Sequence, residues 1–170
     1  NFIVFHLKGS HFNFINRYPQ EFAKFSKPDT YDLIPNYIDS IAYTDYVLQQ
    51  IQEYAAKHLN LQAMVYFSDH ATIPDKRRSP NFGGFANVRI PLFTFFADEY
   101  ISNHPHVYSS LKANQDKYWT NDLAYELICG ILDVKSNHYD EANSLTSAQY
   151  KYTQAMLKTN LGELWIKDDK

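Results

Sequence analysis

The chain has 170 residues, a length typical of one domain, and 45% of them are hydrophobic, enough to build a core. Sixteen Lys and Arg residues stand against nineteen Asp and Glu residues, for a net charge of −3. This balance lacks the positive field that holds nucleic acid by its phosphates, so it argues against a nucleic-acid partner. The single cysteine, Cys129, excludes an internal disulfide, and its apolar neighbours favour an inert buried thiol.

The chain opens on an apolar run, Asn1–Leu7, without the polar residues that begin most domains. We therefore expect the sequence to be a cut through a larger protein. A continuous apolar run of this length is typical of a strand covered on both faces, as in a parallel sheet between helix layers. Residues 63–68 and 88–96 are the second and third such runs. Pro91 favours an edge position or a break in the third, because proline lacks a ladder N–H.

A helix is predicted between the first two strands. Apolar residues recur there at the offsets that line one helix face: Val47, Ile51, Tyr54 and Ala55. Asp39 or Ser40 is expected to cap this helix. Strand, helix and strand then form a βαβ unit with a right-handed crossover.

Two further helices are predicted towards the C-terminus. The first covers residues 123–131, with Asn121 or Asp122 before it, and a weaker one covers residues 147–158. Together with the apolar runs, these helices indicate an α/β fold with a mostly parallel sheet in a single domain over residues 1–170. The segment 72–84, rich in proline, glycine and charge, is predicted to be a loop or lid.

The first candidate site follows the first predicted strand, where His6, Lys8 and His11 flank Gly9. Ligands of open α/β sheets bind at the carboxyl ends of strands. Histidine serves there as a metal ligand or a donor to an anionic oxygen, and Lys8 can add a point charge for a phosphoryl group. The alternative is that His6 completes the strand and His11 caps a turn.

The second candidate site is Asp69 and His70, directly after the second predicted strand. Carboxylate oxygen and imidazole nitrogen form a ligand set suited to Zn²⁺, and neighbouring residues in an irregular turn can reach one cation. Such pairs also occur as ordinary turn-starting residues. A third cluster runs from Asp75 to Arg78 in the predicted lid. Its three cations suit a phosphate or an anionic lipid head group, although a solvated loop tip is the commoner role of a short charge run.

Five segments, taken together and in order, resemble the C-terminal half of the catalytic domain of the phosphoethanolamine transferases, in the sulfatase and alkaline-phosphatase superfamily. The resemblance extends from Asn1 to about Val134. The segments are Ile3–His11; Arg17–Pro19 with Phe22 and Phe25; Tyr43–Leu48; Tyr66–His70; and Arg89–Leu92.

This resemblance implies a partial alkaline-phosphatase-like α/β/α sandwich. It implies an enzyme anchored in the bacterial inner membrane by N-terminal helices, with its catalytic domain in the periplasm. Such enzymes move phosphoethanolamine from a phospholipid to a lipopolysaccharide or glycan acceptor, through a zinc-activated threonine that forms a phospho-enzyme intermediate. By resemblance, Asp69 and His70 are two of the zinc ligands, and His6 contacts the transferred head group or a second zinc. Lys8 and His11 are then expected on the substrate side of the same site.

Three departures from the family qualify this interpretation. The nucleophile and the upstream acidic ligand are expected before Asn1, so this chain alone is expected to be inactive and to bind zinc weakly. Ala71 stands where the family has glycine, and a positive φ there would be strained. Arg77, Arg78 and Ser79 stand where the family has a further head-group histidine. Arg78 therefore either contacts the substrate phosphate or belongs to a site that has changed function.

Two other functions stay open from the sequence. One is a hydrolase of the same superfamily, a sulfatase or a phosphodiesterase. The other is a degenerate, non-catalytic sulfatase-like domain that binds an anionic ligand or partner. All three interpretations predict that His6 and the Asp69–His70 pair lie at one carboxyl edge of the sheet.

Overall fold

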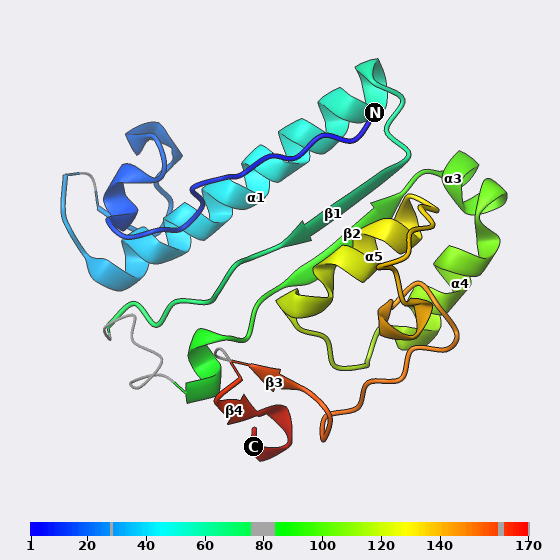
Figure 1. The fold of residues 1–170 in the computed structure, drawn as a ribbon. Coiled ribbons are helices and arrows are strands. Elements are labelled where there is room, and N and C mark those ends of the chain that lie inside the picture. The colour runs from blue at the N-terminus through cyan, green and yellow to red at the C-terminus, as the bar shows by residue number, and fades with distance from the viewer. Residues whose placement is uncertain (28, 76–83, 160–161, 170) are drawn as a thin grey trace. The chain divides into compact units, whose positions relative to one another are not determined.

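A 26-residue helix, α1 (Leu33–His58), dominates the N-terminal part of the computed structural model. The structure describes residues 1–27, 29–75, 84–159 and 162–169. It divides into two units, unit 1 (Asn1–Leu61 and Ile73–Arg77) and unit 2 (Gln62–Thr72 and Arg78–Lys170). Figure 1 labels the helices and strands of both, and each unit is described by itself below. No helix within the described ranges is both long enough and apolar enough to cross a membrane.

Helix α1 confirms the helix predicted around residues 47–55, but it begins much earlier than expected. Its N-cap is Asp32, which has an extended backbone. Asp39 and Ser40 lie inside the helix and are fully buried, so the prediction that one of them caps it is wrong. The physical reason is that the first turns of α1 bury polar residues against a preceding loop, a pattern that apolar periodicity does not reveal.

A polar network joins α1 to that loop. The Asp39 carboxylate accepts hydrogen bonds from the backbone N–H groups of Lys24 (2.8 Å), Phe25 (3.1 Å) and Ser26 (2.9 Å), and from the Ser26 hydroxyl (2.7 Å). One turn earlier, the Tyr18 hydroxyl donates to Asn36 Oδ1 at 2.6 Å. These bonds satisfy a buried charge and fix the loop on the helix. Two short 3-10 turns, Phe14–Asn16 and Gln20–Phe22, precede the loop.

The N-terminal apolar run does not form the strand that was predicted for it. Residues 1–8 adopt neither helix nor strand, and the side chains of Phe2, Ile3, Val4 and Phe5 are more than half exposed. A strand buried on both faces needs ladder partners and covering layers, and the described part of unit 1 contains no strand. The predicted βαβ unit is therefore not formed.

Unit 2 contains the two strands predicted at residues 63–68 and 88–96. Strands β1 (Ala63–Phe67) and β2 (Leu92–Phe96) pair antiparallel, with Ala63 opposite Phe96. β2 begins directly after Pro91, which confirms the expected break. A second antiparallel pair joins β3 (Lys158–Thr159) and β4 (Leu164–Trp165).

The sheets correct the expectation of parallel pairing. Both strand pairs within the described ranges are antiparallel. Parallel neighbours need a crossover connection, usually a helix. Between β1 and β2 the described residues supply only the 3-10 turn Gly84–Asn87.

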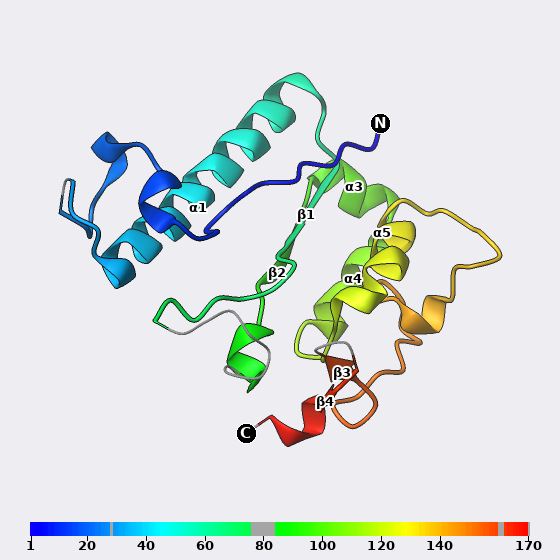
Figure 2. The ribbon, with the colours of Figure 1, turned by 60° about the vertical axis from the view of Figure 1, so that its left-hand side comes forward.

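The described residues of unit 2 also form three α-helices: α3 (Asp98–Asn103), α4 (Pro105–Asn114) and α5 (Ala124–Ile131). Figures 1 and 2 both show α4 and α5 on the same side of the β1–β2 pair. Helix α5 confirms the helix predicted at 123–131, and Cys129 is buried in it as expected. The helix predicted over 147–158 is wrong, because that segment is irregular.

The core of unit 2 is a continuous apolar cluster. One face of the β1–β2 pair contributes partly buried residues such as Val65 and Phe96, and Leu127 of α5 is fully buried. The irregular segment at 145–157 still supplies core side chains, which explains the apolar spacing that suggested a helix there. The buried members are Tyr100, Val107, Leu123, Leu127, Ile131, Leu145, Tyr150, Leu157 and Ile166.

Candidate metal centre

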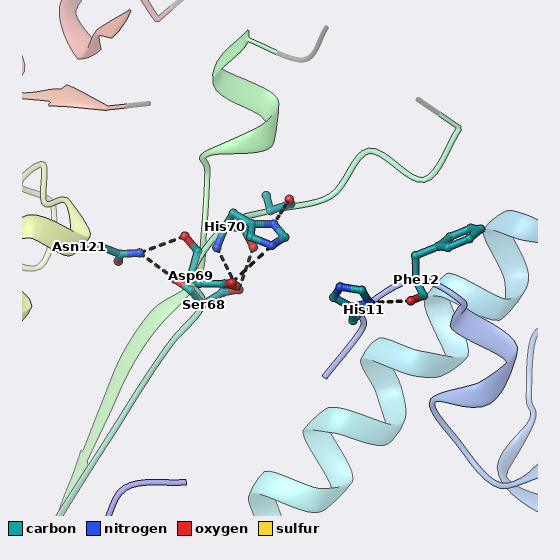
Figure 3. Close-up of polar contacts among 7 residues, drawn as sticks. His11, Phe12, Ser68, Asp69, His70 and Asn121 are labelled. Atoms are coloured by element: carbon teal, nitrogen blue, oxygen red, sulfur yellow. Dashed lines mark hydrogen bonds and ion pairs between the residues drawn. The ribbon is translucent and has the colours of Figure 1, made fainter. Parts of the chain in front are cut away.

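The end of strand β1 presents Asp69 and His70 in a turn held by hydrogen bonds. Directly after β1, the Ser68 hydroxyl donates to the backbone carbonyl of His70 at 2.8 Å. The side-chain amide of Asn121 donates to the carbonyls of Ser68 (3.1 Å) and Asp69 (3.2 Å) (Figure 3). Beyond the turn, the Ala71 N–H donates to the carbonyl of Asn87 at 2.9 Å. Hydrogen bonds thus hold the backbone of the turn both before His70, through Asn121, and after it, through Asn87.

The two side chains of the pair lie against each other. His70 Nε2 is 3.4 Å from Asp69 Oδ2, and the His70 N–H donates to Asp69 Oδ1 at 3.0 Å. His70 Nδ1 lies 2.7 Å from the carbonyl oxygen of Ala71, which only accepts, so we assign the proton of a neutral ring to Nδ1. Nε2 then carries the free lone pair. An Nδ1–H bonded to a carbonyl is the usual support of a histidine that binds metal through Nε2.

The separation of these two atoms fits a shared zinc ion. Zinc holds nitrogen and oxygen ligands at about 2.0–2.1 Å in tetrahedral geometry, which places two ligand atoms about 3.3 Å apart. The observed 3.4 Å between Nε2 and Oδ2 agrees with that value. The Asp69 side chain is 76% exposed and that of His70 is 27% exposed, so further ligands can approach. The same contact also suits an ion pair when the imidazole is protonated.

By itself the pair offers two side chains of types that can bind zinc. Across the described ranges, no three His, Cys, Asp or Glu side chains come together in a way that could hold a metal. Protein zinc sites generally use three or four ligands. The residues present therefore fit zinc in type and spacing, and they could supply two ligands of such a site.

A cleft of about 1250 Å³ in unit 2 contains the pair. Asp69, His70 and Asn121 lie on its lining together with Tyr118 and Trp119. On the same lining, Arg89 forms an ion pair with Asp169, which joins the approach to β2 to the C-terminal segment. Aromatic walls beside a few polar groups are typical of small-molecule and lipid-fragment sites.

Ala71 fits its position without strain. Its φ is not positive, unlike that of Asn60 and Asp133, and its N–H is hydrogen-bonded. The strain foreseen for a residue other than glycine therefore does not arise in this turn.

The other predicted site residues belong to unit 1 or lie outside the described residues. His6, Lys8 and His11 are exposed on the irregular N-terminal segment of unit 1. Gly9 between them has a φ of +48°, and His11 Nδ1 lies 2.5 Å from the carbonyl of Phe12 (Figure 3). Arg78 lies outside the described residues. The predicted alignment of His6 with the Asp69–His70 pair stays a prediction, because the pair belongs to unit 2.

Asn121 is a residue of the candidate site that the sequence does not reveal. The sequence predicts it only as a cap for the helix that follows. Its double hydrogen bond to the β1 turn joins positions 53 and 52 residues apart, so no local pattern signals it. Its place at the start of a predicted helix, with aspartate beside it, was the only available hint.

The chain combines helices and short strands with a polar turn at the end of a strand, and its sequence places it in a known family. Residues 1–129 match the Sulfatase family, and the chain belongs to that family. Among curated proteins it is similar to the Kdo(2)-lipid A phosphoethanolamine 7''-transferase of Escherichia coli K12, at 26% identity over 67% of this chain and 23% of that protein. It is also similar to the phosphoethanolamine transferase EptA of the same strain, at 23% identity over 84% of this chain and 30% of EptA. The chain thus spans about a quarter of the length of these relatives.

A solved structure shows the same fold. It is the C-terminal periplasmic domain of the phosphoethanolamine transferase EptC from Campylobacter jejuni, with a TM-score of 0.65 and 24% identity. The match covers 91% of this chain and 52% of that domain. It confirms the predicted alkaline-phosphatase-like α/β class, with the strand pairing corrected as described above.

Proposed function

We propose that this chain is the C-terminal part of the periplasmic catalytic domain of a phosphoethanolamine transferase. The whole enzyme would be held in the bacterial inner membrane by N-terminal helices. It would move phosphoethanolamine from a phospholipid to a lipopolysaccharide or glycan acceptor. The names of the relatives support the transferred group, and the lipid A in one of those names supports the lipopolysaccharide acceptor. The observation in this chain that carries the proposal is the 3.4 Å contact between His70 Nε2 and Asp69 Oδ2.

In this proposal Asp69 and His70 hold Zn²⁺ together with ligands outside the chain. Bound zinc would stabilise charge on the phosphoryl oxygens and lower the pKa of the nucleophile. The Ala71 carbonyl keeps the His70 proton on Nδ1 and orients the ring. By resemblance the nucleophile is a threonine outside this chain. Its oxygen bonds to phosphorus as the phospholipid alcohol leaves, and an acceptor oxygen then displaces it.

The remaining predicted residues contribute contacts to substrate in this proposal. His6 would contact the transferred head group as a catalytic residue, with Lys8 and His11 beside it as donors to phosphate oxygens. Arg78 would add a bidentate contact to phosphate in place of the family's loop histidine. These roles rest on the resemblance and on the residue chemistry.

The test uses the full-length enzyme and a phospholipid labelled in its phosphoethanolamine group. We expect His70→Ala to lower transfer at least about 100-fold, because it removes a ligand of the catalytic metal. Arg78→Ala should cost far less, because it removes one head-group contact. His138→Ala, an exposed histidine of unit 2 outside the cleft lining, is the matched control and should keep wild-type transfer. Near wild-type transfer by His70→Ala would remove the basis of the proposal.

A second candidate function is a non-catalytic sulfatase-like domain that binds an anionic ligand. The observation that favours it is that Asp69 and His70 come together as two possible ligands, and the described residues offer no group of three that could hold a metal. Calorimetric titration with zinc separates the two candidates. The 170-residue chain should bind zinc weakly and be inactive under both. Tight, stoichiometric zinc binding by the full-length protein that is lost in Asp69→Ala would support the transferase. Absence of tight zinc binding in the full-length protein would support the binding domain.

The same labelled-phospholipid assay separates the transferase from a hydrolase of the superfamily. A transferase passes the labelled group to lipid A or a glycan and requires that acceptor. A phosphodiesterase releases labelled phosphoethanolamine into water without an acceptor. We expect acceptor-dependent transfer.

A further inference from the structure

Asn121 makes an unusual double contact with the turn that carries the proposed zinc ligands. Its Nδ2 donates to the carbonyl of Ser68 at 3.1 Å and to that of Asp69 at 3.2 Å (Figure 3). Both partners only accept, so the amide must present its NH₂ group to them and both N–H donors are used. The two carbonyl partners therefore determine which end of the Asn121 amide faces the turn.

The two carbonyls belong to the peptide groups on either side of Asp69. Fixing both peptide planes limits the φ and ψ angles of Asp69, and with them the direction of its side chain. The second plane also carries the His70 N–H, which bonds to Asp69 Oδ1 at 3.0 Å. One amide thus restrains the backbone from which both proposed ligands project.

The restraint comes from a well-packed element. Asn121 begins a 3-10 turn, Asn121–Leu123, that leads directly into α5. Leu123 is 6% exposed and Leu127 is fully buried in the core of unit 2. Because Asp69 itself is mostly exposed, its own packing cannot hold the turn in place. Asn121 connects the turn to the core.

We propose that Asn121 is a positioning residue for the metal pair. It holds the Ser68 and Asp69 carbonyls so that Asp69 Oδ2 and His70 Nε2 stay at the spacing that zinc requires. This inference rests on the proposed function, because it assigns Asn121 a role towards the same metal. Loss of a hydrogen-bond partner of a metal-ligating side chain typically costs about 10–100-fold in metal affinity. Asn121 acts one bond further out, on the backbone that carries both proposed ligands, so we expect an effect near the lower end of that range.

The experiment measures zinc affinity by chelator competition in the full-length protein, together with the melting temperature without metal and the absorption spectrum with Co²⁺. Asn121→Ala removes both donors, and Asn121→Asp keeps the shape but cannot donate. Both variants should bind zinc about tenfold or more weakly and alter the Co²⁺ spectrum. Their melting temperatures without metal should stay close to each other and to that of the wild type.

Asn114→Ala is the matched control. Asn114 Nδ2 also donates to two backbone carbonyls, those of Leu145 and Ser147, both at 2.9 Å. It is 3% exposed, and none of its hydrogen bonds reaches the metal pair. This variant should lower the melting temperature without metal, because it leaves buried carbonyls unpaired, and keep wild-type zinc affinity and Co²⁺ spectrum.

Each outcome decides between the two proposals. Wild-type zinc affinity and Co²⁺ spectrum in both Asn121 variants, with binding lost in His70→Ala, would overturn the positioning role and leave the proposed function intact. Zinc binding that His70→Ala does not change would instead overturn the proposed function. If both Asn121 variants unfold without metal, Asn121 is a purely structural residue and the positioning role is wrong.

Discussion

The helices of the two units differ in the side chains that they bury most deeply. In unit 1 the fully buried residues of α1 are polar, Asn36, Asp39 and Ser40, and a carboxylate holds the preceding loop. In unit 2 a continuous apolar cluster joins helices, strands and irregular segments. Burial of apolar area depends little on pH, whereas a buried carboxylate stabilises only while it is ionised.

The comparison bears on the candidate metal centre. The Asp69–His70 turn belongs to unit 2, whose core holds it through Asn121 and α5. His6, Lys8 and His11 lie on the irregular segment of unit 1, without a buried side chain among them. The Asp69–His70 pair is therefore tied to a packed element, as precise ligand geometry would require.

The largest effect is expected from Leu127→Ala. Leu127 is fully buried in the cluster of unit 2, and its truncation removes apolar contacts and leaves a cavity. We expect a loss of about 2–5 kcal/mol in the free energy of unfolding. Both tryptophans of the chain, Trp119 and Trp165, belong to unit 2, so tryptophan fluorescence during denaturant unfolding follows that unit. A loss below about 1 kcal/mol would contradict the apolar account of unit 2.

Asp39→Ala tests the polar account of unit 1. The substitution leaves the N–H groups of Lys24, Phe25 and Ser26 without their acceptor. We expect a cost of roughly 2–4 kcal/mol, because several donors lose a charged partner at once. Hydrogen exchange of α1 peptides measures the opening of unit 1. Increased exchange in unit 1, with unchanged tryptophan fluorescence from unit 2, is the expected pattern.

The same carboxylate makes unit 1 sensitive to acid. Burial alone would raise the pKa of Asp39, but the hydrogen bonds from the Ser26 hydroxyl and the backbone N–H groups of residues 24–26 lower it overall. A lowered pKa in the folded state gives stability that is present above the unfolded pKa, near 3.8, and is lost as the pH falls through the folded pKa. Protection of the α1 amides, corrected for the intrinsic exchange rate at each pH, should therefore fall below about pH 4 in the wild type. If Asp39→Asn shows the same acid profile, another group is responsible.

Gly130→Ala probes a close approach between α5 and a neighbouring segment of unit 2. A Cβ at this position of α5 would lie 2.0 Å from Thr146 Oγ1 and 2.9 Å from Ser144 Oγ. Those hydroxyls bond to each other at 2.7 Å in a buried pair, so they cannot move freely. We expect a cost of about 1–3 kcal/mol in a denaturant titration followed by tryptophan fluorescence. In a Thr146→Ala background the cost of Gly130→Ala should be smaller, and an equal cost would show that the contact is not the cause.

The sequence predicted those parts of the fold whose cause is local. Apolar spacing identified α1 and α5, because periodicity reports which face is buried, and continuous apolar runs identified the strands β1 and β2. The prediction from a continuous apolar run failed for residues 1–7, because such a run does not reveal whether strand partners exist. The prediction for Asp39 also failed, since an aspartate near a helix start has the same local appearance whether it caps the helix or binds a distant loop.

The candidate site divides in the same way. Asp69 and His70 were predicted because their chemistry and their place after a strand are visible along the sequence. Asn121 was not, because its partners lie 52 and 53 residues away and depend on how α5 packs in unit 2. Candidate ligand residues can thus be recognised locally, whereas a residue proposed to position them depends on tertiary structure.

Tyr100→Phe has the smallest expected effect and sharpens the comparison at high pH. The Tyr100 hydroxyl donates to the carbonyl of Ile131 at 2.6 Å within the core of unit 2. Its burial, with the charge of Asp133, raises the pKa of Tyr100 to about 12. A raised pKa gives stability that is fully present below the unfolded value of 10.0 and is lost as the pH rises towards 12. The Tyr100→Phe variant should be about 1 kcal/mol less stable than the wild type at neutral pH, because it lacks the hydrogen bond. Since phenylalanine cannot ionise, the free energy of unfolding of the variant should fall less than that of the wild type as the pH rises from 10 to 12.

The measurement is denaturant unfolding of unit 2, followed by tryptophan fluorescence at pH 7 and at pH 11. Burial also raises the pKa of Tyr150 in the same core and of Tyr37 in unit 1, so some alkaline loss will remain in the variant and will not be confined to unit 2. Acid therefore separates the units more cleanly than alkali does. If Tyr100→Phe and the wild type lose equal stability between the two pH values, Tyr100 does not contribute to the alkaline sensitivity of unit 2. Another ionisable group would then cause the loss of stability of unit 2 at high pH, and Tyr150→Phe would be the next variant to measure.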